Sequence, residues 1–361
     1  MYEYSGSIHI HSTFSDGTAV VEEIAKYANE TNLDFIILTD HNTMKARDEG
    51  LEKWFGNTMV IVGCEINDIN NKNHYLTVGL EQLFGKFKPL PNNEFGSELP
   101  ASEYIRLVKE KGAAGFIAHP FEKRSTIPEH PAYPWTEWDS EDFDGIEIWN
   151  HMSEWIEGLT DKNKYQRFFH PLKSIVSPDP KSIKKWDELN LKRKVVAIGS
   201  IDAHAHKHKI MGYEIVIFPY KILFKSIRTH VFVDREIVKG DNENFYDYSK
   251  EIMNGLKKGH SFLVNHYHGD GRGFRFYSEY CDKIYNMGDE YIYDKNKCKS
   301  FKLKVYLPKS TVIKLIKNGK CIDETNGMES NWELEKPGNY RIESWIGDKA
   351  WIFSNYIRIL V

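Results

Sequence analysis

Short apolar runs of strand length alternate with helical patterns over the first two-thirds of the chain, and this alternation most restricts the folds open to it. The pattern is typical of parallel strands joined by helices. The run 35–39 (FIILT) is apolar up to its final threonine, as expected for a strand buried on both faces. At least six such strands favour a barrel over a small doubly wound sheet. The other runs occur at 7–11, 59–63, 75–79, 115–118, 145–149 and 195–199, and the helical patterns at 18–31, 44–54, 101–111 and 181–190.

The character of the chain changes after about residue 212. The stretch 215–219 predicts the last element of the first domain, and 244–259 predicts a helix that ends at Gly259. From Phe301 onward only strands and turns are indicated, including a hairpin around Asn318-Gly319. We therefore predict a barrel domain at 1–240, a connecting helix and loop region at 241–300, and a small C-terminal antiparallel β-sandwich at 301–361.

Residues 121–138 (FEKRSTIPEHPAYPWTEW) contain three prolines and two tryptophans directly after a predicted strand. Proline at this density excludes one regular element. A long aromatic loop at a strand end is typical of a lid over a site, but an ordered surface excursion has the same sequence pattern. Both interpretations stay open.

Composition excludes several classes of protein. A net charge of −4 leaves no general basic field, so we expect no stable nucleic-acid complex. No stretch approaches the roughly 20 apolar residues of a membrane helix, and the first residues do not form a signal peptide, which predicts a cytoplasmic protein without membrane contact. The four cysteines contain no CxxC pair, so we expect buried or inert thiols rather than a disulfide or a thiolate zinc site. The sequence does not predict an oligomeric state.

Polar residues of the metal-binding type follow the predicted strands at their carboxyl ends. These ends converge on one face of a parallel barrel, so the side chains are expected to meet in one pocket. Histidines with carboxylates and without thiolates suit zinc, manganese or iron. Cys64 is expected to point away, because neighbouring strand residues face opposite sides. The residues are His9 and His11, Asp40 and His41, Glu65, His119, and Asp202 and His204.

The order and spacing of six motifs resemble the PHP (polymerase and histidinol phosphatase) family of metallohydrolases. They are HIHSTFSDGT (9–18), LTDHN (38–42), GCEI (63–66), His74 before an apolar strand, AHP (118–120) and GSIDAH (199–204). The LTDHN form, IEIWN (146–150) and the C-terminal KNG, PGNYRIE and WIFSN stretches are similar to a two-domain subfamily named after bacterial carbamate-insecticide hydrolases. The resemblance implies a distorted (β/α)7 barrel with two to three divalent metal ions.

The resemblance also implies the ligands of these ions. Asp16 stands where other members have a histidine, which makes its site richer in oxygen and favours manganese or iron. Asp16 as an ordinary turn residue and His74 as a solvated loop histidine remain alternatives. Asp40 and Asn42 are expected to orient histidines rather than bind metal. The implied sets are His9, His11, Glu65 and Asp202; Asp16, His41 and His204; and Glu65 with His74 and His119.

Such a centre implies a metal-dependent phosphoesterase. Neighbouring metals generate a bound hydroxide and clamp phosphoryl oxygens, so no side-chain nucleophile is assigned. Arg124 is a candidate for holding the phosphate, although a solvated surface charge is the alternative. The expected substrate is a small phosphomonoester, a nucleotide or sugar phosphate. Hydrolysis of a carbamate, ester or amide by the same centre remains open, as does a non-catalytic module that binds partners through its C-terminal domain.

Overall fold

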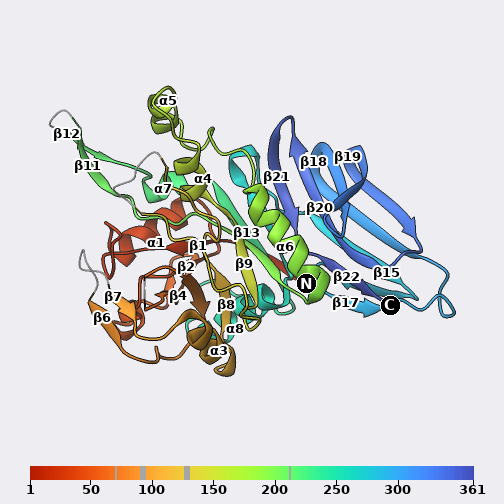
Figure 1. Ribbon diagram of the computed structural model, residues 1–361, viewed down its shortest axis with the longest axis horizontal. Helices are drawn as coiled ribbons and strands as arrows, with labels where there is room; N and C mark the ends of the chain where they lie inside the picture. The colour runs from red at the N-terminus through yellow and green to blue at the C-terminus, as the bar shows by residue number, and fades with distance from the viewer. Residues whose placement is uncertain (70, 90–94, 126–130, 211–212) are drawn as a thin grey trace.

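The computed structural model describes the chain except residues 70, 90–94, 126–130 and 211–212. Figure 1 shows helices and strands mixed in the N-terminal part and a β-rich C-terminal part beside it. The predicted strands of the first part are confirmed. Its strands are β1 (Tyr2–Ile10), β2 (Phe35–Leu38), β3 (Trp54–Phe55), β4 (Thr58–Asn67), β5 (His74–Val78), β6 (Phe87–Pro89), β7 (Phe95–Ser97), β8 (Ala114–Ile117), β9 (Gly145–Asn150), β10 (Val196–Ser200), β11 (Lys207–Ile210), β12 (Tyr213–Val216) and β13 (Ile227–Val233).

Seven of these strands follow one another through hydrogen-bonded pairs in the order β1-β2-β4-β5-β8-β9-β10. The segment after β10 returns to β1, where the amides of Ile201 and Ala203 donate to the carbonyls of Ile8 and His9. The two ends of the strand order therefore lie side by side. Apolar side chains fill one continuous core among these strands, including Ile8, Ile37 and Ile61.

The strands are not all parallel, contrary to the prediction. β5 runs antiparallel to both of its neighbours, β4 and β8. The link between β4 and β5 covers only about six residues, and a parallel crossover needs a dozen or more. The strand β13, which the sequence patterns did not predict, pairs antiparallel with β1. The predicted element at 215–219 instead begins within β12, which pairs with β11 as a separate hairpin.

Helices connect the strands of the first part, and three of the predicted helices are confirmed. The helix at 18–31 is confirmed as α1, and 101–111 and 181–190 are confirmed as α3 and α6. The helix at 44–54 is wrong in length, because α2 covers four residues and Trp54 already belongs to β3. The helices are α1 (Val21–Glu30), α2 (Lys45–Asp48), α3 (Ala101–Glu110), α4 (His151–Glu157), α5 (Lys164–Phe169), α6 (Pro180–Lys192), α7 (Tyr220–Leu223), α8 (Phe245–Lys258) and the 3-10 turn η2 (His266–His268).

Helix α8 packs with the first part, and its Ile252 and Leu256 belong to the core between those strands. It ends as predicted at Gly259, whose φ of 73° is favourable for glycine. No helix among the described residues is long and apolar enough to cross a membrane. The described residues of the 121–138 loop contain no helix or strand, and Trp135 is buried in the core. Residues 126–130 of that loop lie outside the described residues, so the lid stays a prediction.

The C-terminal part is built from strands, as predicted from Phe301 onward, but the predicted connecting helix and loop region at 241–300 is wrong after α8, because four strands, β14 to β17, lie there and pair with their neighbours. A hairpin joins β18 to β19 through Asn318 and Gly319, both with positive φ, as tight hairpin turns require. The pairs are antiparallel except β17 with β22. The strands are β14 (Ser261–Asn265), β15 (Arg275–Tyr280), β16 (Lys283–Asn286), β17 (Glu290–Ile292), β18 (Phe301–Lys317), β19 (Lys320–Leu334), β20 (Gly338–Ile346), β21 (Lys349–Ser354) and β22 (Ile357–Leu360).

The two parts share hydrogen bonds. β14 pairs with β13 on one side and with β21 on the other, so the sheets are continuous. Arg341 of β20 is fully buried and contacts Asp187 of α6 at 3.3 Å. Asn355 donates to the carbonyl of Ala197 in β10 at 3.0 Å.

The prediction of buried or inert thiols without a disulfide is wrong for two cysteines. Cys281 and Cys298 form a disulfide across a separation of 17 residues, because folding brings the end of β15 beside the loop before β18. Cys321 is a free thiol and is exposed, which leaves for it only the inert alternative of the prediction. Cys64 is buried and belongs to the apolar core, as expected for a side chain that points away from Glu65.

Candidate metal centre

Glu65 lies at the middle of a buried group of histidines. It belongs to β4, and 1% of its surface is exposed. Its two oxygens divide the imidazoles between them, three facing Oε2 and two facing Oε1. Each carboxylate oxygen, together with the imidazoles that it faces, can bind one cation. Glu65 is therefore placed to bridge two neighbouring cations. The nitrogen–oxygen distances are 3.0 Å to His9, 3.2 Å to His11 and 3.4 Å to His41 for Oε2, and 2.9 Å to His74 and 3.2 Å to His119 for Oε1.

His9 and His11 reach the same carboxylate oxygen, as strand alternation predicts, but the local backbone is irregular. The register between β1 and β2 shifts between Ile8 and Ile10, and His9 has a φ of 66°. Asp202, in the segment after β10, also has a positive φ of 52°. Non-glycine residues in this region are strained, and such residues gather at functional sites. The strain here lies at three residues that face the centre, the third being His119 with a φ of 25°.

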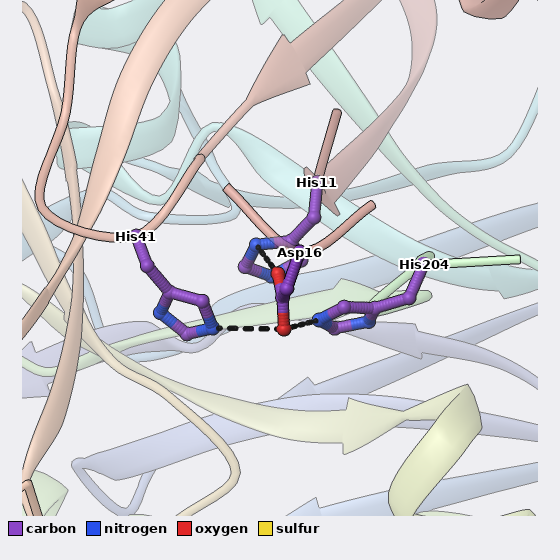
Figure 2. A group of neighbouring side chains, drawn as sticks. All are labelled: His11, Asp16, His41 and His204. Carbon is purple, nitrogen blue, oxygen red and sulfur yellow. Dashed lines mark ion pairs between the residues drawn. The ribbon is translucent and has the colours of Figure 1, made fainter. Parts of the chain in front are cut away.

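Asp16 lies among three imidazoles rather than in a solvated turn. Figure 2 shows its carboxylate pointing toward His11, His41 and His204, which come from three separate segments. Its oxygens are 3.5 Å from His11 Nδ1, 3.7 Å from His41 Nε2 and 3.1 Å from His204 Nε2. The rings of His11 and His204 stack with centroids 4.0 Å apart. The side chain of Asp16 is 34% exposed, so this edge of the centre is its most open described part.

Asp202 is a second carboxylate of the centre, and it faces three of the histidines. Its Oδ1 lies 3.3 Å from His9 Nε2 and 3.5 Å from both His11 Nε2 and His204 Nδ1. Asn150, at the end of β9, donates to its other oxygen at 3.2 Å. Asp202 is 3% exposed, so its charge depends on these neighbours rather than on water.

The fold thus brings together all nine residues proposed as ligands. They form four overlapping groups of potential ligand atoms, each within 4.8 Å. The grouping differs from the expected one in that His11 joins Asp16, and His74 and His119 fall in separate groups that share Glu65. The groups are His11, Asp16, His41 and His204; His9, Glu65 and His119; His9, His11 and Asp202; and His41, Glu65 and His74.

Buried nitrogens without hydrogen bonds fit this donor set to a cation. Among the described residues, His74 Nε2, His119 Nδ1 and both ring nitrogens of His11 have no hydrogen-bond partner. Burying such groups without a partner costs about 1–3 kcal/mol each, which a coordinated cation offsets. The donor atoms are imidazole nitrogens and carboxylate oxygens, the set that zinc, manganese and iron accept.

The carboxylates stay ionised in this buried site because the imidazoles face them. Burial opposes the charge of Glu65, but His9 and His41 hold the pKa of its carboxyl well below the ordinary value. Burial likewise opposes protonation of His11, but Asp202 and Glu65 raise its pKa to about 10. Burial lowers the pKa of His74 to about 4. His74 is therefore neutral near pH 7, whereas His11 holds a proton that a metal ion must displace.

Glu147 is a residue of this site that the sequence patterns did not assign. It lies in β9 and is 1% exposed. Its Oε1 is 2.9 Å from His9 Nδ1, and its Oε2 accepts the amide of His119 at 2.6 Å and the side-chain amide of Asn150 at 2.9 Å. A carboxylate that orients a histidine is typical of metal sites. The sequence did contain a sign of this role, because Glu147 is a charged residue between two isoleucines of a predicted buried strand.

The two predicted supporting residues, Asp40 and Asn42, hydrogen-bond two loop serines and a backbone amide. Asp40 accepts hydrogen bonds at 2.7 Å from the amide and hydroxyl of Ser12 and from the hydroxyl of Ser15, so it holds the loop before Asp16. Asn42 accepts the amide of Asn67 at 3.0 Å. Asn67 is the residue that faces a histidine, with its Oδ1 3.1 Å from His41 Nδ1.

Arg124 is near the centre but already has a partner. Its Nε donates to Glu122 Oε1 at 2.9 Å, and its guanidinium lies 5.7 Å from the ring centroid of Tyr133. That ring stacks on His74 with centroids 4.6 Å apart. Phosphate binding by Arg124 remains a prediction, in which Glu122 competes with the anion for the guanidinium.

Comparison with known proteins finds a family match within the first part of the chain. Residues 7–117 match the family model of the PHP domain, which confirms the resemblance seen in the motifs. This range includes six of the nine proposed ligands and ends before His119. No curated protein sequence matches the chain significantly.

Three solved structures that are similar to this chain are described as different types of enzyme. A two-domain protein containing a predicted PHP-like metal-dependent phosphoesterase from Bacteroides vulgatus is 16% identical, with a TM-score of 0.45 over 98% of this chain and 95% of that one. The lesion-specific endonuclease PfuEndoQ from Pyrococcus furiosus is 15% identical, with a TM-score of 0.42 over 71% and 56%. An amidohydrolase from Chromobacterium violaceum is 13% identical, with a TM-score of 0.34 over 60% and 92%.

Proposed function

We propose that this chain, which contains a PHP domain at residues 7–117, is a metal-dependent hydrolase that cleaves a small phosphomonoester. The observation that carries the proposal is Glu65, which is buried and faces five imidazoles with its two oxygens. Divalent ions bound there supply Lewis-acid chemistry, by acidifying water and by offsetting charge on phosphoryl oxygens. A nucleotide or a sugar phosphate is the substrate class that we infer.

The nine residues that we propose to hold two to three ions are those that the fold gathers around Glu65 and Asp16. We further infer that the first part is a distorted (β/α)7 barrel, with a β-sandwich after it. The hydrogen bonds from Ile201 and Ala203 back to β1 support a closed barrel. The domain boundaries near residues 240 and 300 remain part of this proposal.

The side chains around the proposed ligands orient them by hydrogen bonds and take no part in the reaction. Glu147 holds His9 in one ring orientation, so that Nε2 is the nitrogen that faces Glu65 and Asp202. Asp40 fixes the hydroxyls of two serines in the loop before Asp16. The hydroxyl of Ser200 donates to Glu147. Because these hydroxyls are already donated to carboxylates, we assign no serine as nucleophile.

The test is metal-dependent release of inorganic phosphate by the purified protein, with its metals counted by elemental analysis. We expect two to three ions of zinc, manganese or iron per chain, and hydrolysis of p-nitrophenyl phosphate that a chelator abolishes. Glu65→Gln removes one charge from the bridging position and is expected to lower turnover by at least 100-fold. Glu243→Gln, on the exposed loop before α8, is the matched control.

Two results contradict the proposal. One is a protein that binds no metal even when the metal is supplied during expression. The other is a metal-loaded protein that releases an amine or alcohol from carbamates or carboxylic esters and no phosphate from any phosphoester. The second result leaves the metal centre intact and changes the substrate class.

A further inference from the structure

The hydroxyl of Tyr220, in α7, lies between two segments that carry proposed metal ligands. The residue is 2% exposed, and its hydroxyl donates to the carbonyl of His11 at 2.8 Å and to that of His204 at 3.1 Å. A tyrosine hydroxyl has one proton, so the two carbonyl oxygens share it. His11 directly follows β1, and His204 follows β10. Tyr220 therefore ties together the backbones of two ligands that are far apart in the chain.

Thr18 adds hydrogen bonds to the same junction. Its amide donates to the carbonyl of His204 at 3.0 Å and lies 3.2 Å from the hydroxyl of Tyr220. Its own hydroxyl donates to the carbonyl of Ala205 at 2.8 Å. Ala205 has a φ of 54°, which is unfavourable for a residue with a side chain. Thr18 and Tyr220 thus hold the segment around His204 in a strained conformation.

The loop after His11 is folded tightly against this junction. The amide of Gly17 donates to the carbonyl of Ser12 at 3.0 Å, and a Cβ at position 17 would lie 2.3 Å from the carbonyl oxygen of His11. Glycine at this position leaves that oxygen accessible to the hydroxyl of Tyr220. Asp16 directly precedes the glycine, so the position of its carboxylate depends on the same junction.

The ligands at this junction belong to one group of the candidate centre. His11, Asp16 and His204 offer ligand atoms within 4.8 Å of one another, together with His41. Figure 2 shows these side chains converging from separate segments. Asp16 is 34% exposed, so packing restrains it less than it restrains the buried residues. Because a metal ion needs its ligands within about 0.5 Å of the right position, this group depends on how its backbone is held.

Tyr220 is itself held in place before any metal binds. Its helix α7 is joined to α1 by the ion pair of Lys221 with Glu30 at 2.6 Å. Leu223 and Phe224 are fully buried in the core that also contains residues of α1. The ring of Tyr220 belongs to that core as well. The hydroxyl is therefore presented in one position, and binding need not order it.

From these contacts, we propose that Tyr220 is a positioning residue for the metal ion held by His11, Asp16, His41 and His204. It acts through the backbone carbonyls of His11 and His204 and is not a ligand, because its proton is donated to those carbonyls. The proposal rests on the proposed function, since it concerns one ion of the proposed centre.

The test is Tyr220→Phe, which removes the hydroxyl and keeps the ring in the core. We expect the ion at this group to bind about 10-fold more weakly, and the ions nearest Glu65 to bind as before. Titration of the metal-free protein with cobalt(II), which accepts the same nitrogen and oxygen donors, gives the number and affinity of the ions by elemental analysis. The visible absorption of the bound cobalt, which depends on ligand geometry, is expected to change as well.

Tyr280→Phe is the matched control. Tyr280 is 6% exposed, and its hydroxyl donates to the carbonyl of Asp294 and accepts the amide of the same residue, both at 2.8 Å. This pair of hydrogen bonds lies in the C-terminal part. We expect Tyr280→Phe to lose stability as Tyr220→Phe does but to keep the cobalt affinity and spectrum of the unaltered protein.

Two further comparisons locate the effect. Thr18→Val removes the second hydroxyl of the junction and is expected to weaken the same ion, whereas Thr18→Ser keeps the hydroxyl and restores binding. In Asp16→Asn, where this group has already lost its ion, Tyr220→Phe is expected to cause no further loss of metal. Additional loss in that double variant shows that Tyr220 acts elsewhere and overturns the proposal.

Unchanged cobalt affinity and spectrum in folded Tyr220→Phe also overturn the proposal, while the proposed function stands. If Tyr220→Phe does not fold, equal affinities in Thr18→Val and Thr18→Ser overturn it instead. Selective weakening of one ion supports the positioning role even if no phosphoester is cleaved, a result that would overturn only the proposed function. A protein that binds no cobalt overturns the proposed function and this inference with it.

Discussion

The carboxylate of Glu147 lies 2.9 Å from Nδ1 of His9, with both side chains buried. This contact directs the other nitrogen of His9 at Glu65 and Asp202. The same carboxylate accepts the backbone amide of His119, so one residue orients two of the proposed ligands.

Glu147→Gln is therefore expected to weaken metal binding by about 10- to 100-fold with the fold retained. The glutamine amide places N–H groups against the donors that now face the carboxylate. Metal titration monitored by elemental analysis measures the change. Glu141→Gln, an exposed residue just before β9, is the matched control and is expected to bind metal as the unaltered protein does. Unchanged affinity in Glu147→Gln contradicts the orienting role.

Asp16→Asn tests the more open edge of the centre. Its carboxylate faces three imidazoles within 3.7 Å, so loss of the charge is expected to remove one ion per chain and leave those nearest Glu65. Elemental analysis after dialysis gives the count. Asp48→Asn, on the exposed side of α2, serves as the comparison. If Asp16→Asn binds as many ions as the unaltered protein, Asp16 is an ordinary turn residue and not a ligand.

The protonation of Glu154 makes the free energy of unfolding depend on pH. Burial raises the pKa of its carboxyl to about 7, above the ordinary value of 4.5, despite hydrogen bonds from Val176 and Trp149. Because the folded protein holds this proton more tightly than the unfolded chain, the contribution to stability is fully present below about pH 4.5 and is lost as pH rises through 7.

Glu154→Gln is thus expected to flatten the dependence of unfolding free energy on pH between 5 and 8. Urea denaturation at several pH values gives this slope for both proteins. Glu188→Gln, an exposed residue of α6, is expected to keep the slope of the unaltered protein. Parallel slopes for Glu154→Gln and the unaltered protein contradict the raised pKa.

Arg341→Met tests how the C-terminal part is fastened to the first. The guanidinium lies between Asp187 of α6 and Glu343 of β20, and its removal leaves two partly buried carboxylates without a cation. Breaking a buried ion pair costs about 3–5 kcal/mol of unfolding free energy. Arg235→Met, whose pair with Asp247 is exposed, is expected to cost about 1 kcal/mol or less. Equal losses in the two variants disprove the fastening role.

Replacing Cys281 and Cys298 by serine tests the disulfide. A bridge of this loop length contributes about 3 kcal/mol to the free energy of unfolding. We expect a loss of this size, measured by urea denaturation, with an unchanged metal count because the bridge lies in the C-terminal part. Cys321→Ser, at an exposed free thiol, controls for the substitution. Detection of two further free thiols in the unaltered, unreduced protein contradicts the bridge.

The sequence by itself determined strands β1, β2, β4, β5, β8, β9 and β10, helices α1, α3 and α6, the β-rich end of the chain and the nine candidate ligands. These features depend on local causes. Apolar runs form buried strands, Asn318-Gly319 forms a tight turn, and the metal-type residues lie within or close to the ends of the strands. Six spaced motifs then gave the resemblance to the PHP family, whose domain model matches residues 7–117.

Only the tertiary structure decided the features that join distant segments. The reversal of β5, the pairing of β13 with β1, the Cys281–Cys298 bridge and the role of Glu147 each depend on which strands become neighbours. A charged residue in an apolar run has no partner in its own segment. Its partner is supplied when another strand brings a histidine beside it, because burying the carboxylate without one is too costly.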